Sequence, residues 1–299
     1  MKKLTLAYFG SPDFAADFLE RLITDVSIDR LIDIKLIVTQ PDQKVGRKQT
    51  LTPTPVKKIA LKFENLVIEN SLEIRNLKLE ISKCDIALVY AYGDLIPEEL
   101  LNIPKYGFWN IHPSLLPKYR GPSPIAAPLI NGDKTTGVTI IKMDEEIDHG
   151  PIIAQETLTI DKDDKRPDLE KKLTDLAFKM FKKTVFNKDS LQLKSQNHKL
   201  ASYTKKMSKQ DGFVSFENLK LKIENSPEVL YNLFRGLSPW PGIWTMVKPI
   251  QLRQLDEAKR LKITNLTMEQ SNNLTIKSVQ LEGKNEVDFE TFNKAYKVF

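Results

Sequence analysis

Two side chains suited to acyl transfer flank Ile111 near the middle of the chain. Asn110 and His112 stand two residues apart at the end of an apolar run, and Pro113 follows them. Side chains at positions i and i+2 of a β-strand point to the same side, so this amide and this imidazole would project together. Acyl transfer passes through a tetrahedral oxyanion, which needs hydrogen-bond donors aimed at its oxygen. Asn110 and His112 are therefore a candidate oxyanion-binding pair.

A carboxylate that could assist this pair is Asp148, in the segment Met-Asp-Glu-Glu-Ile-Asp-His-Gly at residues 143–150. A carboxylate beside an imidazole orients the ring and stabilises its cation while an attacking amine gives up a proton. The three residues alone are weak evidence, because Asn-x-His pairs also cap turns and Asp148 could form a turn beside Gly150. His149 and His198 carry no comparable context. The sequence contains no Gly-x-Ser-x-Gly motif and no cysteine-nucleophile pattern, and the chemistry needs no metal.

Short apolar runs alternate with amphipathic stretches in the first half of the chain, and this pattern predicts the elements that would position these residues. We expect strands over residues 4–9, 33–39, 85–92, 107–112, 136–143 and 151–160, and helices over residues 13–23, 53–63, 71–79, 125–130 and 168–186. Strands separated by helices imply right-handed crossovers and a mostly parallel sheet, so we expect a doubly wound α/β domain. Ligands of such sheets bind outside the carboxyl ends of the strands, where His112 should lie.

The second half predicts a smaller β-rich domain. Residues 187–210 are polar with little periodicity and are expected to join two domains. Apolar runs at residues 213–216, 244–247 and 274–281 predict short strands, interrupted by one helix at residues 227–237. A small OB-like β-barrel would fit this pattern. We therefore expect an α/β catalytic domain at residues 1–188, a basic linker at residues 189–208 and the β-barrel domain at residues 209–299.

Charge and composition narrow the class of protein. The net charge is +6, and basic residues outnumber acidic ones by 14 to 7 between residues 161 and 210. Such a surplus is typical of a polyanion partner such as nucleic acid, although a solvated lysine-rich face has the same composition. The single cysteine, Cys84, excludes an internal disulfide and a multi-thiolate zinc site. It fits a cytoplasmic protein, as does the lack of an apolar run long enough for a signal peptide or a membrane span.

Taken together, these motifs resemble those of the 10-formyltetrahydrofolate-dependent formyltransferase family. The resemblance rests on residues 110–124, on Thr136-Gly-Val-Thr-Ile and on residues 143–148. It implies a formyl transfer to an amine in which Asn110, His112 and Asp148 are catalytic. It also implies that the co-substrate 10-formyltetrahydrofolate lies along two segments, whose residues are Ser114, Leu115, Leu116 and Pro117 and, mainly through the backbone, Tyr90, Ala91, Tyr92 and Ile96. Packing in the core is an equal alternative for Ile96.

Three further segments resemble the branch of this family whose acceptor is methionyl-initiator-tRNA. They are the opening Phe9-Gly-Ser-Pro-Asp-Phe-Ala, a long basic loop with Arg47 and Lys48, and the C-terminal segments Pro239-Trp-Pro-Gly and residues 279–284. The resemblance implies that Arg47 and Lys48 contact the tRNA. We expect the protein to be a monomer. Beside Asp148, Glu146 and His149 depart from the family pattern.

Two alternatives stay open on the residues themselves. The same chemistry could act on an amino-sugar nucleotide or another small amine. The chain could instead be an inactive α/β domain joined to an RNA-binding module, with aromatic side chains that stack on bases or simply form the core. These aromatic residues are Phe213, Phe216, Phe234, Trp240 and Trp244.

Overall fold

The computed structural model describes residues 3–46, 48–63, 67–69, 74–248, 258–269 and 273–298. The chain divides into two compact units. The first comprises Met1–Pro124, Thr136–Thr159 and Glu170–Thr204, and the second comprises Ile125–Thr135, Ile160–Leu169 and Lys205–Phe299. In the described part of the chain, no helix combines the length and the apolar character needed to cross a membrane.

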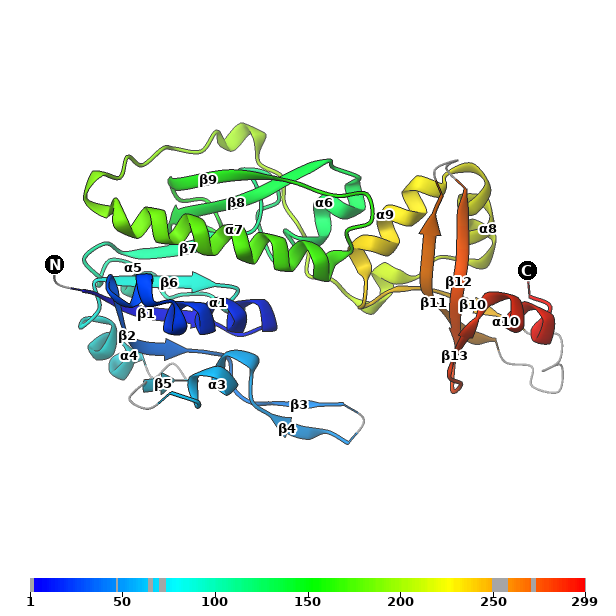
Figure 1. Ribbon diagram of the computed structural model, residues 1–299, viewed down its shortest axis with the longest axis horizontal. Coiled ribbons are helices and arrows are strands. Elements are labelled where there is room, and N and C mark those ends of the chain that lie inside the picture. The colour runs from blue at the N-terminus through cyan, green and yellow to red at the C-terminus, as the bar shows by residue number, and fades with distance from the viewer. Residues whose placement is uncertain are drawn as a thin grey trace. The chain divides into compact units, whose positions relative to one another are not determined.

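The first unit is built on a seven-stranded sheet with the order β5-β2-β1-β6-β7-β8-β9 (Figure 1). Its strands are β1 (Leu4–Gly10), β2 (Ile32–Val38), β5 (Val67–Glu69), β6 (Ile86–Tyr90), β7 (Phe108–His112), β8 (Thr135–Lys142) and β9 (Ile152–Thr159). The first five in the sheet are parallel, as the sequence predicts. The strand β8 is antiparallel to β7. It also runs antiparallel to β9, because Lys142 bonds to Pro151 and Ile160 bonds to Lys134, and the segment between the two strands is too short for a crossover helix.

Helices cover both faces of this sheet. They are α1 (Asp13–Thr24), α2 (Val26–Asp29), α3 (Pro55–Ala60), α4 (Ile74–Ile81), α5 (Glu98–Leu101) and α7 (Arg166–Phe186). On one face, the ring of Phe181 in α7 lies 5.9 Å from Phe18 in α1 and 6.5 Å from Trp109 in β7. On the other face, residues of α4 and α5 share a buried cluster with Phe9 and Phe108. The prediction of a doubly wound α/β domain is confirmed.

The strands predicted for the first half all form, each within two residues of its expected bounds. One prediction there is wrong. The segment with Arg47 and Lys48 was expected to be a loop, but β3 (Gln43–Val45) and β4 (Thr50–Thr52) pair as an antiparallel hairpin. Gly46 and Gln49 take positive φ values of 73° and 51° at its turn, which a tight hairpin connection requires. Arg47 lies outside the described residues.

The second unit holds a four-stranded antiparallel sheet with the order β10-β11-β12-β13. Its elements are β10 (Ile243–Val247), β11 (Lys259–Met268), β12 (Leu274–Leu281) and β13 (Glu286–Asp288), with helices α6 (Ala126–Asn131), α8 (Phe216–Asn225), α9 (Pro227–Leu237) and α10 (Phe289–Tyr296). The expected small β-domain is therefore present, as an antiparallel sheet. Among the described residues, pairing between β10 and β13 that would close a barrel is not seen.

One strand predicted for this unit is wrong. Residues 213–216 form no strand beyond a single bridge from Phe213 to Trp244, and α8 begins at Phe216. The reason is a helix cap, because the Ser215 hydroxyl accepts a hydrogen bond from the backbone of Asn218 at 3.3 Å. The helix α10 was not expected either.

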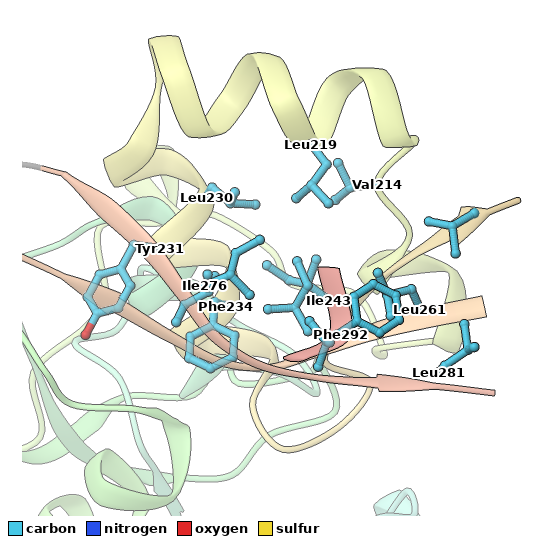
Figure 2. Close-up of a cluster of buried hydrophobic side chains, with 14 residues drawn as sticks. Val214, Leu219, Leu230, Tyr231, Phe234, Ile243, Leu261, Ile276, Leu281 and Phe292 are labelled. Atoms are coloured by element: carbon cyan, nitrogen blue, oxygen red, sulfur yellow. The ribbon is translucent and has the colours of Figure 1, made fainter. Parts of the chain in front are cut away.

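Side chains from the sheet and from its helices meet in one apolar core (Figure 2). Phe234 and Phe292 are buried there, 2% and 1% exposed, beside Leu261 and Ile276 of the sheet. Phe234 is thus a core residue, whereas Trp240 is 51% exposed.

Candidate active site

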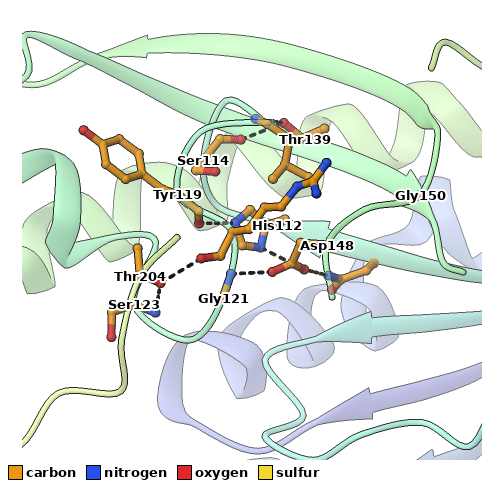
Figure 3. A network of polar contacts seen from close by, with 12 residues as sticks. His112, Ser114, Tyr119, Gly121, Ser123, Thr139, Asp148, Gly150 and Thr204 are labelled. Atoms are coloured by element: carbon orange, nitrogen blue, oxygen red, sulfur yellow. Dashed lines mark hydrogen bonds and ion pairs between the residues drawn. The ribbon is translucent and has the colours of Figure 1, made fainter. Parts of the chain in front are cut away.

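The predicted trio comes together at the carboxyl end of β7 (Figure 3). Asn110 Nδ2 donates to Oδ1 of Asp148 at 3.0 Å, and Nδ1 of His112 lies 3.3 Å from the same oxygen. Both side chains therefore project from the same side of β7, as strand alternation predicts. Only one of the two amide hydrogens of Asn110 is used by Asp148, so the other can serve a second acceptor.

The second ring nitrogen of His112 also has a hydrogen-bond partner. Its Nε2 lies 2.9 Å from the carbonyl oxygen of Tyr119. A carbonyl only accepts hydrogen bonds, so Nε2 carries a hydrogen in this arrangement. The His112 side chain is 5% exposed, and both of its ring nitrogens face oxygen atoms. The ring is therefore held in one orientation.

Asp148 is the centre of these contacts. Its Oδ2 accepts a hydrogen bond from the backbone of Gly121 at 2.7 Å, and its φ is +52°. Burial raises the pKa of this carboxyl, but the facing His112 ring and the Gly121 amide outweigh burial and hold the pKa below its usual value. Asp148 is thus ionised at neutral pH and suits the role of a fixed negative charge.

The first predicted folate segment, residues 114–117, is held in place by hydrogen bonds to side chains of β8 and β9. The hydroxyl of Thr139 in β8 donates to the Ser114 carbonyl at 2.6 Å and accepts from the Leu116 backbone at 3.1 Å. Gln155 of β9 donates to the Leu116 carbonyl at 2.9 Å and to the Thr139 hydroxyl at 2.8 Å. Ser114 is fully buried, and its own hydroxyl donates to the carbonyl of Lys118 at 2.7 Å. Its side chain therefore holds the loop.

The second predicted segment follows β6, and its aromatic rings face the core. Tyr90 is buried, with its hydroxyl 3.1 Å from that of Thr174, and the Tyr92 ring packs on Phe9 at 5.6 Å. Burial raises the pKa of both tyrosines. Ile96 packs on the same core cluster as Phe9. The side chains of Tyr90, Tyr92 and Ile96 are therefore engaged in packing.

The conformation of this second segment is set by neighbouring loops. Ala91 and Gly93 take positive φ values of 52° and 93°. The hydroxyl of Ser11, after β1, donates to the Tyr92 carbonyl at 2.8 Å and accepts from the Gln40 backbone at 3.2 Å. Three loops at the carboxyl ends of parallel strands are tied together in this way. This edge of a doubly wound sheet is where ligands bind.

The chain is similar in sequence to proteins of a known family. The sequence profile of the family described as "Formyl transferase" matches residues 2–185. The chain is 37% identical to the methionyl-tRNA formyltransferase of Caldicellulosiruptor saccharolyticus, over 99% of this chain and 98% of that protein. It is 34% identical to the methionyl-tRNA formyltransferase of Halothermothrix orenii, again over 99% of this chain and 98% of that protein. The chain belongs to the methionyl-tRNA formyltransferase family.

The family resemblance inferred from the motifs is thereby confirmed. The fold is also shared with an N-formyltransferase from Helicobacter canadensis solved in complex with folinic acid and dTDP-3-aminofucose. That structure has a TM-score of 0.61 and 19% identity, over 94% of this chain and 95% of that chain. At this identity the likeness concerns the fold alone.

In this member of the family, several residues that the sequence analysis missed support the site. They belong to a segment that we call the strap, residues 194–204, which lies within the stretch predicted as the linker. Backbone bonds join the strap to Arg120, from the Arg120 nitrogen to the Ser202 carbonyl at 2.8 Å and from the Thr204 nitrogen to the Arg120 carbonyl at 2.7 Å. The side chain of Ser202 accepts a further bond from the Tyr119 backbone at 2.9 Å. A polar stretch without periodicity carries no signal of such contacts.

The three histidines of the chain all lie near this site. His149 and His198 stack with ring centroids 4.0 Å apart. His149 Nδ1 lies 2.7 Å from Asp144, and its Nε2 lies 3.9 Å from Glu146. The two family departures, Glu146 and His149, thus contact each other and not the Asp148 carboxylate.

Two exposed regions could meet a larger substrate. Lys48 lies at the tip of the β3–β4 hairpin, where Val45 and Leu51 are also exposed, 55% and 62%. In the second unit, Trp244 packs on Phe213 at 4.8 Å and lies beneath the ammonium group of Lys209 at 5.7 Å.

Proposed function

We propose that this chain transfers the formyl group of 10-formyltetrahydrofolate to the α-amino group of methionyl-initiator-tRNA. The proposal rests on one observation above all. The donors of Asn110 and His112 converge on one carboxylate oxygen of Asp148 at the ligand-binding edge of the sheet. The similarity along the whole chain to methionyl-tRNA formyltransferases supports the choice of acceptor.

The folate co-substrate would supply the activated formyl group, and the described residues fit its binding. The backbone at Tyr90, Ala91 and Tyr92, with Ile96, would bind the pterin edge. The pinned segment of Ser114, Leu115, Leu116 and Pro117 would form the opposite wall. Ala91 and Gly93, with positive φ, turn the backbone at the end of β6 away from strand geometry, and polar groups other than the Tyr92 carbonyl, which Ser11 binds, would face a ligand.

The three proposed catalytic residues would act by stabilising the charge that develops on the formyl oxygen. A methionyl α-amine has a reference pKa of about 7.7–8.0, so a large share of it is neutral near pH 7.5. As it attacks the formyl carbon, negative charge grows on the formyl oxygen. When this intermediate collapses, the bond between the formyl carbon and the folate nitrogen breaks, and the proton lost by the amine ends on that leaving nitrogen. The second amide hydrogen of Asn110 would meet that charge, and the Nε2 hydrogen of His112 would reach it in exchange for the Tyr119 carbonyl, while Asp148 holds both side chains in place. Removal of one such donor costs about 10²–10³-fold in rate in other acyl-transfer sites.

The acceptor tRNA would be held by basic groups of both units. Arg47 and Lys48 on the hairpin would pair with phosphates near the amino-acid end. Residues 209–299 would bind the tRNA body through lysines and exposed aromatic rings, with residues 1–188 carrying the transfer and residues 189–208 joining the two. We expect a cytoplasmic monomer, because translation initiation takes place there and the chain carries all three proposed catalytic residues.

One assay tests the proposal. The purified chain is given 10-formyltetrahydrofolate with methionyl-initiator-tRNA, and an amino-sugar nucleotide is added as a competing acceptor. We expect formyl-methionyl-tRNA as the main product, and a loss of about 10²-fold or more in folded Asn110→Ala and His112→Ala variants. Formylation of the sugar alone would reassign the acceptor. RNA binding without any transfer would favour an inactive RNA-binding protein.

A further inference from the structure

The side chain of Gln196 in the strap makes three hydrogen bonds, two to the segment of Asp148 and Gly150 and one to Arg120. It is 5% exposed, although its sequence neighbours are exposed. Its Nε2 donates to the backbone carbonyl of Asp148 at 2.9 Å and to that of Gly150 at 2.8 Å. Its Oε1 accepts from Nη2 of Arg120 at 2.8 Å. Both amide hydrogens and the amide oxygen are therefore used.

Asp148 needs support of this kind because of its backbone. A residue other than glycine with φ near +52° sits in the left-handed region, which is unfavourable for most residues that carry a Cβ atom. Such a conformation persists only where neighbouring groups hold it. Asn110 and Gly121 bind the carboxylate of Asp148, and Gln196 binds its peptide carbonyl. Hydrogen bonds therefore hold both the side chain and the backbone of Asp148.

These contacts close a ring. Gln196 bonds to Arg120, Arg120 is covalently joined to Gly121, Gly121 bonds to the Asp148 carboxylate, and the Asp148 carbonyl bonds back to Gln196. Arg120 is itself 2% exposed, and its Nη2 also lies 2.8 Å from Nδ1 of His198. The ring fixes the direction in which the carboxylate of Asp148 faces His112.

We propose that Gln196 is a positioning residue for formyl transfer, which sets Asp148 through its backbone without touching either substrate. This inference rests on the proposed function. It assigns a role in the chemistry to the strap, which lies beyond residue 188, the predicted end of the catalytic domain.

Gln196→Met tests the role, because methionine keeps the length of the side chain and removes all three hydrogen bonds. We expect kcat to fall about 10- to 100-fold, since small displacements of a catalytic group have effects of this size. The KM values for the folate and for the tRNA should change by no more than about twofold, because Gln196 lies behind Asp148. Gln192→Met, at an exposed glutamine of the same stretch, is the matched control and should behave as wild type.

A second variant covers the case in which Gln196→Met fails to fold. Gln196→Glu keeps an oxygen for Arg120 but sets a carboxylate against the carbonyls of Asp148 and Gly150. We expect this variant to stay folded and to lose kcat as well. Wild-type kcat in Gln196→Glu would overturn the inference, as would a change confined to KM in either variant.

A readout without turnover separates this inference from the proposed function. Carbon-13 NMR of aspartate-labelled protein follows the titration of Asp148 in wild type and in Gln196→Met. Loss of the hydrogen bonds from Gln196 should let the Asp148 carboxylate move from His112 and should raise its pKa towards the ordinary aspartate value. An inactive wild type would refute the proposed function yet leave this shift measurable, whereas an active wild type with an unmoved pKa and unchanged kcat in Gln196→Met would refute only the positioning role.

Discussion

Nδ1 of His112 lies 3.3 Å from Oδ1 of Asp148, and the two side chains are only 5% and 10% exposed. A pair of this kind, enclosed but adjacent to a ligand-binding edge, interacts more strongly than one in water. The carbonyl of Tyr119 faces the other side of the ring, so the imidazole is fixed between two oxygen atoms.

The negative charge of Asp148 should matter more than its shape. Asp148→Asn keeps the size of the side chain and removes the charge that holds both donors. We expect kcat to fall by about 10²-fold or more, measured as formyl transfer to methionyl-tRNA. Asp29→Asn, at an exposed carboxylate paired with Lys3, is the control. Equal rates in the two variants would contradict a charge-holding role.

The same carboxylate should make stability depend on pH. The folded pKa of Asp148 lies below its usual value, so it lies below the unfolded value of about 3.9. Its contribution is therefore complete above about pH 4 and is lost as the pH falls through the folded pKa. Urea unfolding of wild type and Asp148→Asn from neutral to acid pH measures this. The difference in unfolding free energy should narrow on acidification, and a constant difference would argue against the charged interaction.

Two threonines on β8 should respond in opposite ways to the same substitution. Thr139→Val leaves the Ser114 carbonyl and the Leu116 amide without their partner, which costs about 1–3 kcal/mol. We also expect a higher KM for 10-formyltetrahydrofolate, because these two groups position its predicted wall. The hydroxyl of Thr136 is buried without a hydrogen-bond partner, so Thr136→Val should be neutral or stabilising.

Urea unfolding and the KM for 10-formyltetrahydrofolate, measured on Thr139→Val and Thr136→Val, test both expectations. Equal losses of stability would mean that the loop is held by packing and not by the Thr139 hydroxyl. A destabilised Thr139→Val enzyme with an unchanged folate KM would separate the loop from folate binding.

The hairpin lysine should act on tRNA binding alone. Lys48→Ala removes one exposed positive charge at the β3–β4 turn. If Lys48 pairs with a phosphate, the slope of log affinity against log salt should decrease by about one unit. The folate KM should be unchanged. Lys83→Ala, which removes a lysine paired with Glu80 after α4, should leave the slope as it is. A slope that Lys48→Ala leaves unchanged would exclude this phosphate contact.

Periodic parts of the structure were predictable from sequence, and the supports of the site were not. Asn110 and His112 share a side because strand alternation is geometric, and α7 forms because apolar residues recur along one face. The short apolar run at residues 213–216 predicts a strand. The cap at Ser215 begins the helix α8 there instead, so the strand does not form. Gln196 and Arg120 are 76 residues apart and meet through single polar contacts, which leave no periodic pattern.

The strap also bears on where a working catalyst can end. The family profile stops at residue 185, before Gln196, Ser202 and Thr204. A fragment cut there would keep Asn110, His112 and Asp148 but would lack the groups that bind Arg120 and the Asp148 carbonyl. If Gln196 positions Asp148 as proposed, we expect the smallest active piece of this protein to extend beyond residues 2–185, which match the family profile.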